Sequence, residues 1–409
     1  SARNDIILTA DNGTITIKGK NATSRANISS DTGLISIKAI ANTHATKAIW
    51  IGSAVFNGNV SIFGKTFSNQ GDTYYYEGVN AVFLTGSLLF KHGTVNISGV
   101  SEGQGKGVTI YNSPLFEISG DVVMNISGEV YGSDPYGYAG GVFIGLTDSS
   151  IGLKLINNGV LNIDGTAHAS SWNGTGVSFG TYNQYNPASY FDASFTGDGQ
   201  TYVNGKAGSG NGVAVASNLS IAGGGGIDLT GEAVSKGVVI AANMSTKETV
   251  NLNVSGTSQN SDGVYFVKTS VDAQDSSNFT ISGSSVKGNG VNLGNNKFNS
   301  VSVSAESDSG SGLVVSNGNI SNSQINAISG KGIGINVSGN TSLNNTKLIG
   351  DSTNSTGVTV TGNLTSAGNT TVAGNATGNG IGVDLGGNVT GGRITGNSAS
   401  GSGVTVSGS

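Results

Sequence analysis

Aromatic side chains in the amino-terminal half of the sequence are the residues best suited to binding chemistry. Tyr and Trp offer flat apolar faces with a polar edge, which suits stacking on the C–H faces of sugars and contact with proteins. Six tyrosines lie in residues 131–138 and 181–191, where Pro135 and Pro187 exclude a central strand position. We therefore expect protruding loops, although the aromatic side chains could instead fold back and cap their own loops. The predicted ligand-binding patch comprises Tyr131, Tyr136, Tyr138, Trp172, Tyr182, Tyr185 and Tyr190.

Asn-x-Ser/Thr sequons recur along the sequence, and each is an acceptor motif for N-linked glycosylation. The candidate glycosylation sites are Asn96, Asn125, Asn218, Asn253, Asn319, Asn336, Asn363, Asn375 and Asn388. Local structure also produces such sequons, because Asn suits tight corners and Thr suits strands. Corner asparagines that point inward would instead form hydrogen-bonded ladders.

Residue types that serve catalysis or metal binding are present but scattered. The three histidines, His44, His92 and His168, are far apart and lack paired carboxylates at ligand spacing, so we expect them at the surface. Acidic residues recur singly, without basic partners that repeat along the chain. We therefore predict that the protein is not an enzyme and uses no metal or cofactor, with a polysaccharide-active enzyme as a remote alternative.

A short cassette, a glycine followed by alternating apolar residues, must position all of these side chains. The repeat unit is roughly two dozen residues, a period typical of solenoids. In residues 357–360 the two valines should point to one side and Thr359 to the other, so that one face of the strand is buried. The cassettes begin at Gly107, Gly141, Gly176, Gly212, Gly237, Gly263, Gly290, Gly312, Gly334, Gly357, Gly382 and Gly403.

Corners such as Gly362-Asn363 follow the cassettes, and two further short apolar segments complete each repeat. The 68 glycines, with abundant Ser, Thr and Asn, disfavour helical repeats. The sequence therefore predicts an all-β fold, a right-handed parallel β-helix with roughly three short strands per coil and about 16 coils. We expect residues 1–409 to form a single β-helix, with a decorated half over residues 1–202 and regular coils over residues 203–409.

Composition excludes several classes of partner. Charged residues are 11% of the sequence and the net charge is −5, without a basic run, which argues against nucleic acid and anionic membranes. No apolar stretch approaches the roughly 20 residues that would span a bilayer, so we expect no membrane insertion. The absence of cysteine is consistent with export. Because the sequence starts without Met and stops just after a cassette, we expect a fragment of a longer solenoid.

The cassette and corner Gly-Val-Thr-Val-Thr-Gly-Asn at residues 357–363 resembles the haemagglutinin-type β-helices of two-partner-secretion exoproteins. That family includes filamentous haemagglutinin, the high-molecular-weight adhesins and EtpA. The resemblance implies export through an outer-membrane secretion partner and attachment to host glycans or surface proteins. It also implies contact with another bacterial surface structure such as flagellin in some members, and N-linked hexoses in others.

Together these observations predict a secreted or surface-exposed bacterial adhesin that attaches to host-cell glycans or proteins. Its mechanism would be passive, with a stiff scaffold that presents many weak contacts at once. The alternative is a structural stalk without adhesive activity. The two hypotheses differ in one expectation, since only the adhesin binds a ligand by itself.

Overall fold

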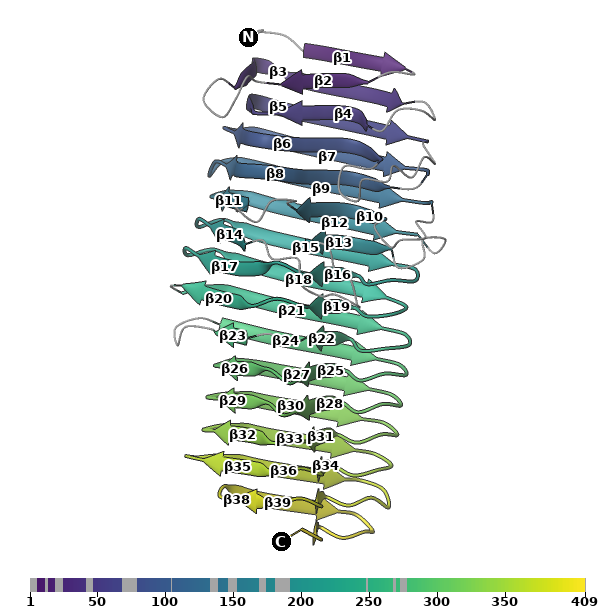
Figure 1. Cartoon of the computed structure of the whole chain (residues 1–409), viewed down its shortest axis with the longest axis vertical. Helices are drawn as coiled ribbons and strands as arrows, with labels where there is room; N and C mark the ends of the chain where they lie inside the picture. Colours follow the sequence, from purple (N-terminus) through teal and green to yellow (C-terminus); the bar gives the residue numbers. More distant parts are fainter. Residues whose placement is uncertain are drawn as a thin grey trace. The chain divides into compact units, whose positions relative to one another are not determined.

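The computed structural model describes residues 6–11, 14–18, 25–41, 47–67, 79–103, 105–132, 139–145, 153–168, 174–180, 192–247, 249–267, 270–272 and 278–408. These residues form β-strands joined by turns and bends (Figure 1). The chain divides into two compact units, Ser1–Gly231 and Glu232–Ser409.

The strands of the first part of the chain are β1 (Ile6–Asp11), β2 (Ile15–Lys18), β3 (Ala26–Ala41), β4 (Lys47–Gly52), β5 (Ala54–Thr66), β6 (Asn80–Phe90), β7 (Gly93–Ser101), β8 (Lys106–Ile118), β9 (Val122–Val130), β10 (Gly140–Gly145), β11 (Leu153–Asn157), β12 (Val160–Ala167), β13 (Thr175–Phe179), β14 (Asp192–Thr196), β15 (Gln200–Ala207), β16 (Val213–Val215), β17 (Asn218–Ala222) and β18 (Gly226–Ala233).

The later strands are β19 (Val238–Ile240), β20 (Met244–Lys247), β21 (Asn251–Ser258), β22 (Val264–Phe266), β23 (Ser270–Asp272), β24 (Asn278–Ser285), β25 (Val291–Gly294), β26 (Lys297–Asn299), β27 (Val301–Ser307), β28 (Leu313–Ser316), β29 (Asn319–Ser321), β30 (Gln324–Ser329), β31 (Ile335–Ser338), β32 (Thr341–Asn344), β33 (Lys347–Ser352), β34 (Val358–Val360), β35 (Leu364–Ala367), β36 (Thr371–Ala376), β37 (Val383–Leu385), β38 (Val389–Thr390), β39 (Arg393–Ser398) and β40 (Val404–Val406).

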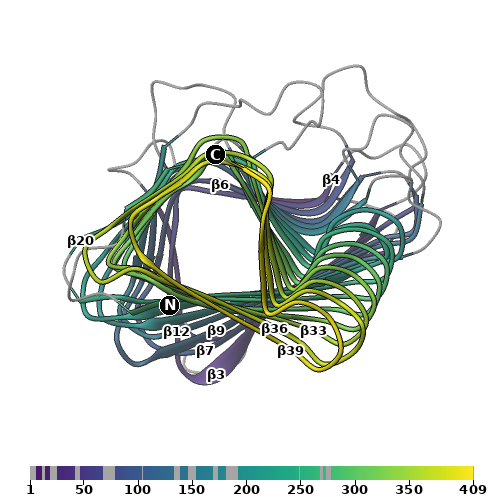
Figure 2. The same ribbon diagram turned by 90° about the horizontal axis from the view of Figure 1, so that it is seen from below.

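Each coil of the second unit contains three strands, and each strand pairs in parallel with its counterpart one coil later. Strands β34, β35 and β36 pair with β37, β38 and β39, respectively. Seen along the coils, the green and yellow outlines of this unit follow the same path, with the successive loops fanned out at one corner (Figure 2). The predicted all-β fold, a parallel β-helix, is confirmed.

Alternation along the cassette strands gives each coil an apolar interior. In β34 the side chains of Val358 and Val360 are fully buried, whereas Thr359 between them is half-buried. Val358 pairs in register with Ile335 on one side and Val383 on the other, and all three are inaccessible to solvent. Burial of each such side chain contributes about 1.5–3 kcal/mol, so three-residue strands suffice to hold a coil.

The cassette glycine lies where two backbones of one coil approach closely. A β-carbon added to Gly374 of β36 would lie only 2.0 Å from the carbonyl oxygen of Gly382, which starts the next cassette. In the first unit, a β-carbon at Gly128 would lie 1.9 Å from the carbonyl oxygen of Gly141. Glycine recurs at these positions because a side chain would displace the backbone opposite.

A column of buried serines closes the corner between the third strand of one coil and the next cassette. The Ser329 hydroxyl donates to the carbonyl of Gly310 at 2.7 Å and accepts from the backbone N–H of Gly332 at 2.9 Å. Ser307 and Ser352 make the same pair of bonds one coil before and one coil after. The column satisfies backbone groups that the tight corner leaves outside the β-ladder.

The early coils of the first unit depart from three separate strands, because β6 and β8 each run through a cassette and the segment that follows it. Their interior is aromatic: the rings of Phe56 and Phe90 stack at 5.3 Å, and Phe90 lies 5.5 Å from Phe116. From β10 onward the coils have the expected three strands.

The outward side of the cassette strands β6, β8 and β10 is also buried, in contrast to the prediction that one face is buried. Phe83, Tyr111 and Phe143 form a cluster outside the coil interior, with Trp50 packed against it. Thr109, which pairs in register with both Phe83 and Phe143, is fully buried. Here the cassette strands have an apolar environment on both faces.

Candidate functional site

The structure describes one member of the predicted ligand-binding patch, Tyr131, which is 38% exposed and lies directly after β9. The other six members lie outside the described residues: Tyr136, Tyr138, Trp172, Tyr182, Tyr185 and Tyr190. The candidate site is therefore built from Tyr131 and the residues that surround it.

Tyr131 occupies a column of surface residues that follow the last strand of successive coils. Its backbone N–H donates to Ser101 at 2.9 Å, and that of His168 donates to Val130 at 3.0 Å. This parallel ladder places equivalent residues of neighbouring coils one above the other. The column contains Phe67, Glu102, Tyr131 and His168.

The ring of Tyr131 stacks on the ring of His168. Their centroids are 3.9 Å apart and their planes differ by 10°. The Tyr131 hydroxyl donates to Oε2 of Glu129 at 2.7 Å, and Nε2 of His168 lies 3.4 Å from the same oxygen. The hydrogen bond to Glu129 raises the pKa of Tyr131 above its ordinary value, and the negative charges of Glu129 and Glu102 act in the same direction.

A second contact group lies beside this pair. Nζ of Lys65 is 2.7 Å from Oε1 of Glu102 and 4.8 Å from the ring centroid of Phe67, whose side chain is 39% exposed. We call the whole surface the corner patch, and it comprises Lys65, Phe67, Glu102, Glu129, Tyr131 and His168. It combines aromatic rings with charged groups beside them, which suits sugars and peptide side chains.

The sequence prediction placed His168 at the surface but did not associate it with Tyr131. A local repeat carries the missing signal: Asn125-Ile-Ser-Gly-Glu-Val130 matches Asn162-Ile-Asp-Gly-Thr-Ala167 position by position. The strand register follows this match, since Asn162 pairs with Asn125 and Ala167 with Val130. The residue after each segment therefore falls in the same column.

The asparagines of the predicted glycosylation sites all lie at the surface or are half-buried. The exposed group comprises Asn96, Asn319, Asn363, Asn375 and Asn388, and the half-buried group comprises Asn125, Asn218, Asn253 and Asn336. Two of them take part in an outward ladder: Asn125 Nδ2 donates to Asn96 at 2.8 Å, and Asn162 Nδ2 donates to Asn125 at 2.8 Å. This asparagine ladder therefore lies on the outer face of the coils.

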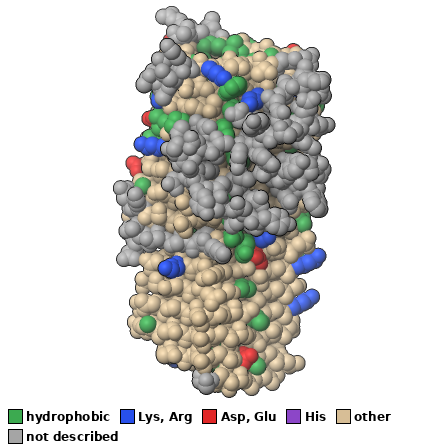
Figure 3. Space-filling model, in the orientation of Figure 1, with side chains coloured by type: hydrophobic (Ala, Val, Ile, Leu, Met, Phe, Trp, Pro, Cys, Tyr) green, Lys and Arg blue, Asp and Glu red, His purple; other side chains and the backbone are tan. Residues whose placement is uncertain are grey.

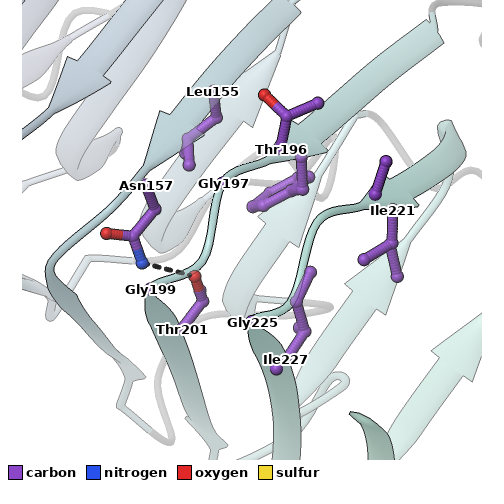
Figure 4. Close-up of a pocket in the computed structure, with 12 residues that line it drawn as sticks. Leu155, Asn157, Thr196, Gly197, Gly199, Thr201, Ile221, Gly225 and Ile227 are labelled. Atoms are coloured by element: carbon purple, nitrogen blue, oxygen red, sulfur yellow. Dashed lines mark hydrogen bonds between the residues drawn. The ribbon is translucent and has the colours of Figure 1, made fainter. Parts of the chain in front are cut away.

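A small hollow lies in the first unit between β11, β14 and β17 (Figure 4). Asn157 Nδ2 donates to Oγ1 of Thr201 at 3.1 Å, and the glycines Gly197 and Gly225 leave the space open. Its volume of about 20 Å³ is enough for a water molecule but not for a sugar ring. We therefore treat it as a packing feature of the corner.

Charged side chains are few and separated on the face shown in Figure 3. Within the part of the chain that the structure describes, no group of three or more His, Asp or Glu side chains could hold a metal ion. The same residues include no helix of the length and apolarity needed to cross a membrane.

No protein-family model matches the chain, and no curated protein is significantly similar to it.

Proposed function

We propose that this chain is part of a secreted or surface-exposed bacterial adhesin that attaches to host-cell glycans or proteins through the corner patch. The observation that carries the proposal is the stacked pair Tyr131 and His168, exposed at a corner of the β-helix and held by Glu129. A side chain whose orientation is fixed in advance loses little entropy when it binds.

Binding would use the aromatic rings and the charged side chains beside them together. The apolar C–H face of a sugar, or an aliphatic side chain of a protein, would pack on Tyr131 or Phe67. Hydroxyl or amide groups of the ligand would hydrogen-bond to Glu129 and Lys65. Each contact is weak, so attachment would depend on many chains at one surface.

Export, an outer-membrane secretion partner for the full-length protein, and contact with a bacterial surface structure such as flagellin are part of the same proposal. They rest on the resemblance at residues 357–363. We also propose glycosylation of the sequon asparagines. Asn319 and Asn375 are exposed, so their side-chain amides are accessible for it.

The competing function is a stalk that carries an adhesive element located elsewhere. The regular β-helix of the second unit favours it, because parallel coils paired in register make a stiff scaffold. A polysaccharide-active enzyme is a distant third proposal, and a screen for polysaccharide cleavage tests it.

The deciding experiment measures binding of the purified chain to host cells and to a glycan array. The adhesin predicts saturable binding that falls at least tenfold in a Tyr131→Ala, His168→Ala double variant, while the exposed control Ser304→Ala binds like the parent. A second variant replaces residues 132–138 and 181–191 with short Gly-Asn segments. Failure of the parent chain to bind either surface would favour the stalk.

A further inference from the structure

Asp262 in the second unit is the one carboxylate with a buried side chain among the described residues, at 8% exposure. Its Oδ1 accepts from Nδ2 of Asn289 at 2.8 Å and from the backbone N–H of Asn289 at 3.3 Å. Its Oδ2 accepts from Nδ2 of Asn292 at 3.2 Å. Burying a carboxylate is costly unless it is hydrogen-bonded, so three amide donors hold this one in a fixed orientation.

The fold of the corner does not require this carboxylate. Asp262 immediately precedes the cassette glycine Gly263, and Ser311, Ile333 and Thr356 occupy the same position in later coils. The backbone bond from Gly263 to Asn289, at 2.9 Å, has a counterpart of 2.9 Å from Gly312 to Ile333. An apolar residue thus supports the same corner, and the acidic group is additional to what the backbone needs.

An aromatic side chain lies beside the carboxylate. Tyr265 is the outward residue of β22, half-buried between the fully buried Val264 and the interior Phe266. It pairs in register with Asn292, the residue that donates to Asp262. Nζ of Lys236 lies 5.5 Å from the centroid of the Tyr265 ring.

The fold does not require an aromatic residue at the outward position of Tyr265. The equivalent residues of the next cassettes are Asn292, Val314, Asn336 and Thr359. A tyrosine, a lysine and an oriented carboxylate therefore lie close together at positions where the fold of the repeat requires none of these residue types.

We infer that Lys236, Asp262 and Tyr265, with Asn292, form a binding site for an uncharged carbohydrate. The Tyr265 ring offers a face for the C–H groups of a pyranose. Asp262 can accept a hydrogen bond from one sugar hydroxyl, while Lys236 donates to the oxygen of another, which matches a vicinal diol. The two opposite charges leave the site without net charge, so it gains nothing from a sulfate or sialate group and suits a neutral sugar.

This site is separate from the corner patch and does not depend on it. Its residues belong to the second unit, whereas the corner patch belongs to the first. The test therefore uses the full chain carrying Tyr131→Ala and His168→Ala, so that any remaining sugar binding is assigned to the second unit.

The experiment is ligand-observed NMR with lactose as the neutral probe and its sialylated counterpart as the charged probe. Lactose should bind, and Tyr265→Ala and Asp262→Asn should each weaken binding by about tenfold or more, since each removes one recognition element. Asn336→Ala, at the equivalent outward position three coils later, is the matched control and should bind like the parent. Melting temperatures of all variants establish that the coils remain folded.

Two results would overturn the inference. One is that the parent does not bind lactose, or that Tyr265→Ala binds lactose with the same affinity as the parent. The other is stronger binding of the sialylated probe than of lactose, which would assign recognition to Lys236 alone. Retained lactose binding in Tyr265→Phe, which keeps the ring and removes the hydroxyl, would further support stacking as the main contact.

Discussion

The outward side of the cassette strands differs between two regions of the molecule. In β10, Phe143 points away from the coil interior yet is only 6% exposed, and Ser178 of β13 is 7% exposed. In β31 and β34 the corresponding Asn336 and Thr359 are half-buried. The same backbone unit therefore carries a second apolar layer in one region and a polar surface in the other, which shows that the repeat fixes the inner face and leaves the outer face open to variation.

The largest expected effect tests the inner face of the cassette strands in the second unit. Val358→Asp places an unpaired charge among Ile335 and Val383 and should reduce the free energy of unfolding by about 4 kcal/mol. Thr359→Lys, one residue away on the outer face and in register with Asp384, should change it by less than about 0.5 kcal/mol. Denaturant unfolding measures both, and equal losses would contradict the assigned orientation of β34.

The next effect tests whether the outer face of the first unit behaves as a core. Phe143→Ala should reduce stability by about 3 kcal/mol, because it removes a buried ring that also contacts Lys106, whose Nζ is 5.1 Å from the ring centroid. Asn336→Ala, the outward counterpart in the second unit, should be nearly neutral. If both variants lose the same free energy of unfolding, burial of the outer face in the first unit does not contribute to stability.

Much of this fold was predictable from local pattern. The alternation of apolar and polar residues at Val358, Thr359 and Val360 predicted both the strand and its buried face, because side chains of a strand point alternately to its two faces. The burial of Phe143 was not predictable, since periodicity does not tell what packs on the outer face. Predicting the contact between Tyr131 and His168 requires the register between neighbouring coils, and the segments of variable length between the strands obscure that register.

A smaller effect concerns the serine column, which sequence reasoning missed although Ser-x-x-Gly recurs at residues 307–310 and 329–332. Ser329→Ala removes two hydrogen bonds from a buried corner and should cost about 1–2 kcal/mol. Ser304→Ala on the exposed face of β27 is the matched control and should be neutral. Ala376 occupies the serine position in β36, so the column tolerates one interruption.

The smallest effect leaves stability unchanged and concerns the corner patch alone. The pKa of Tyr131 is raised, so its hydroxyl stays protonated to higher pH than an ordinary tyrosine and donates to Glu129 until the pH passes that raised value. Glu129→Gln should lower the pKa towards its ordinary range. Absorbance titration of each protein against its Tyr131→Phe derivative isolates this one phenol, and an unchanged midpoint would exclude the hydrogen bond in solution.

Cysteine labelling tests the comparison between the two regions most directly, because the chain contains no cysteine of its own. Single variants Ser178→Cys and Thr359→Cys place a thiol on the outward side of β13 and of β34. The structure predicts slow labelling at position 178 until the protein is denatured, and rapid labelling at position 359 in the native protein. Equal native labelling rates at the two positions would contradict the second apolar layer and the account built on it.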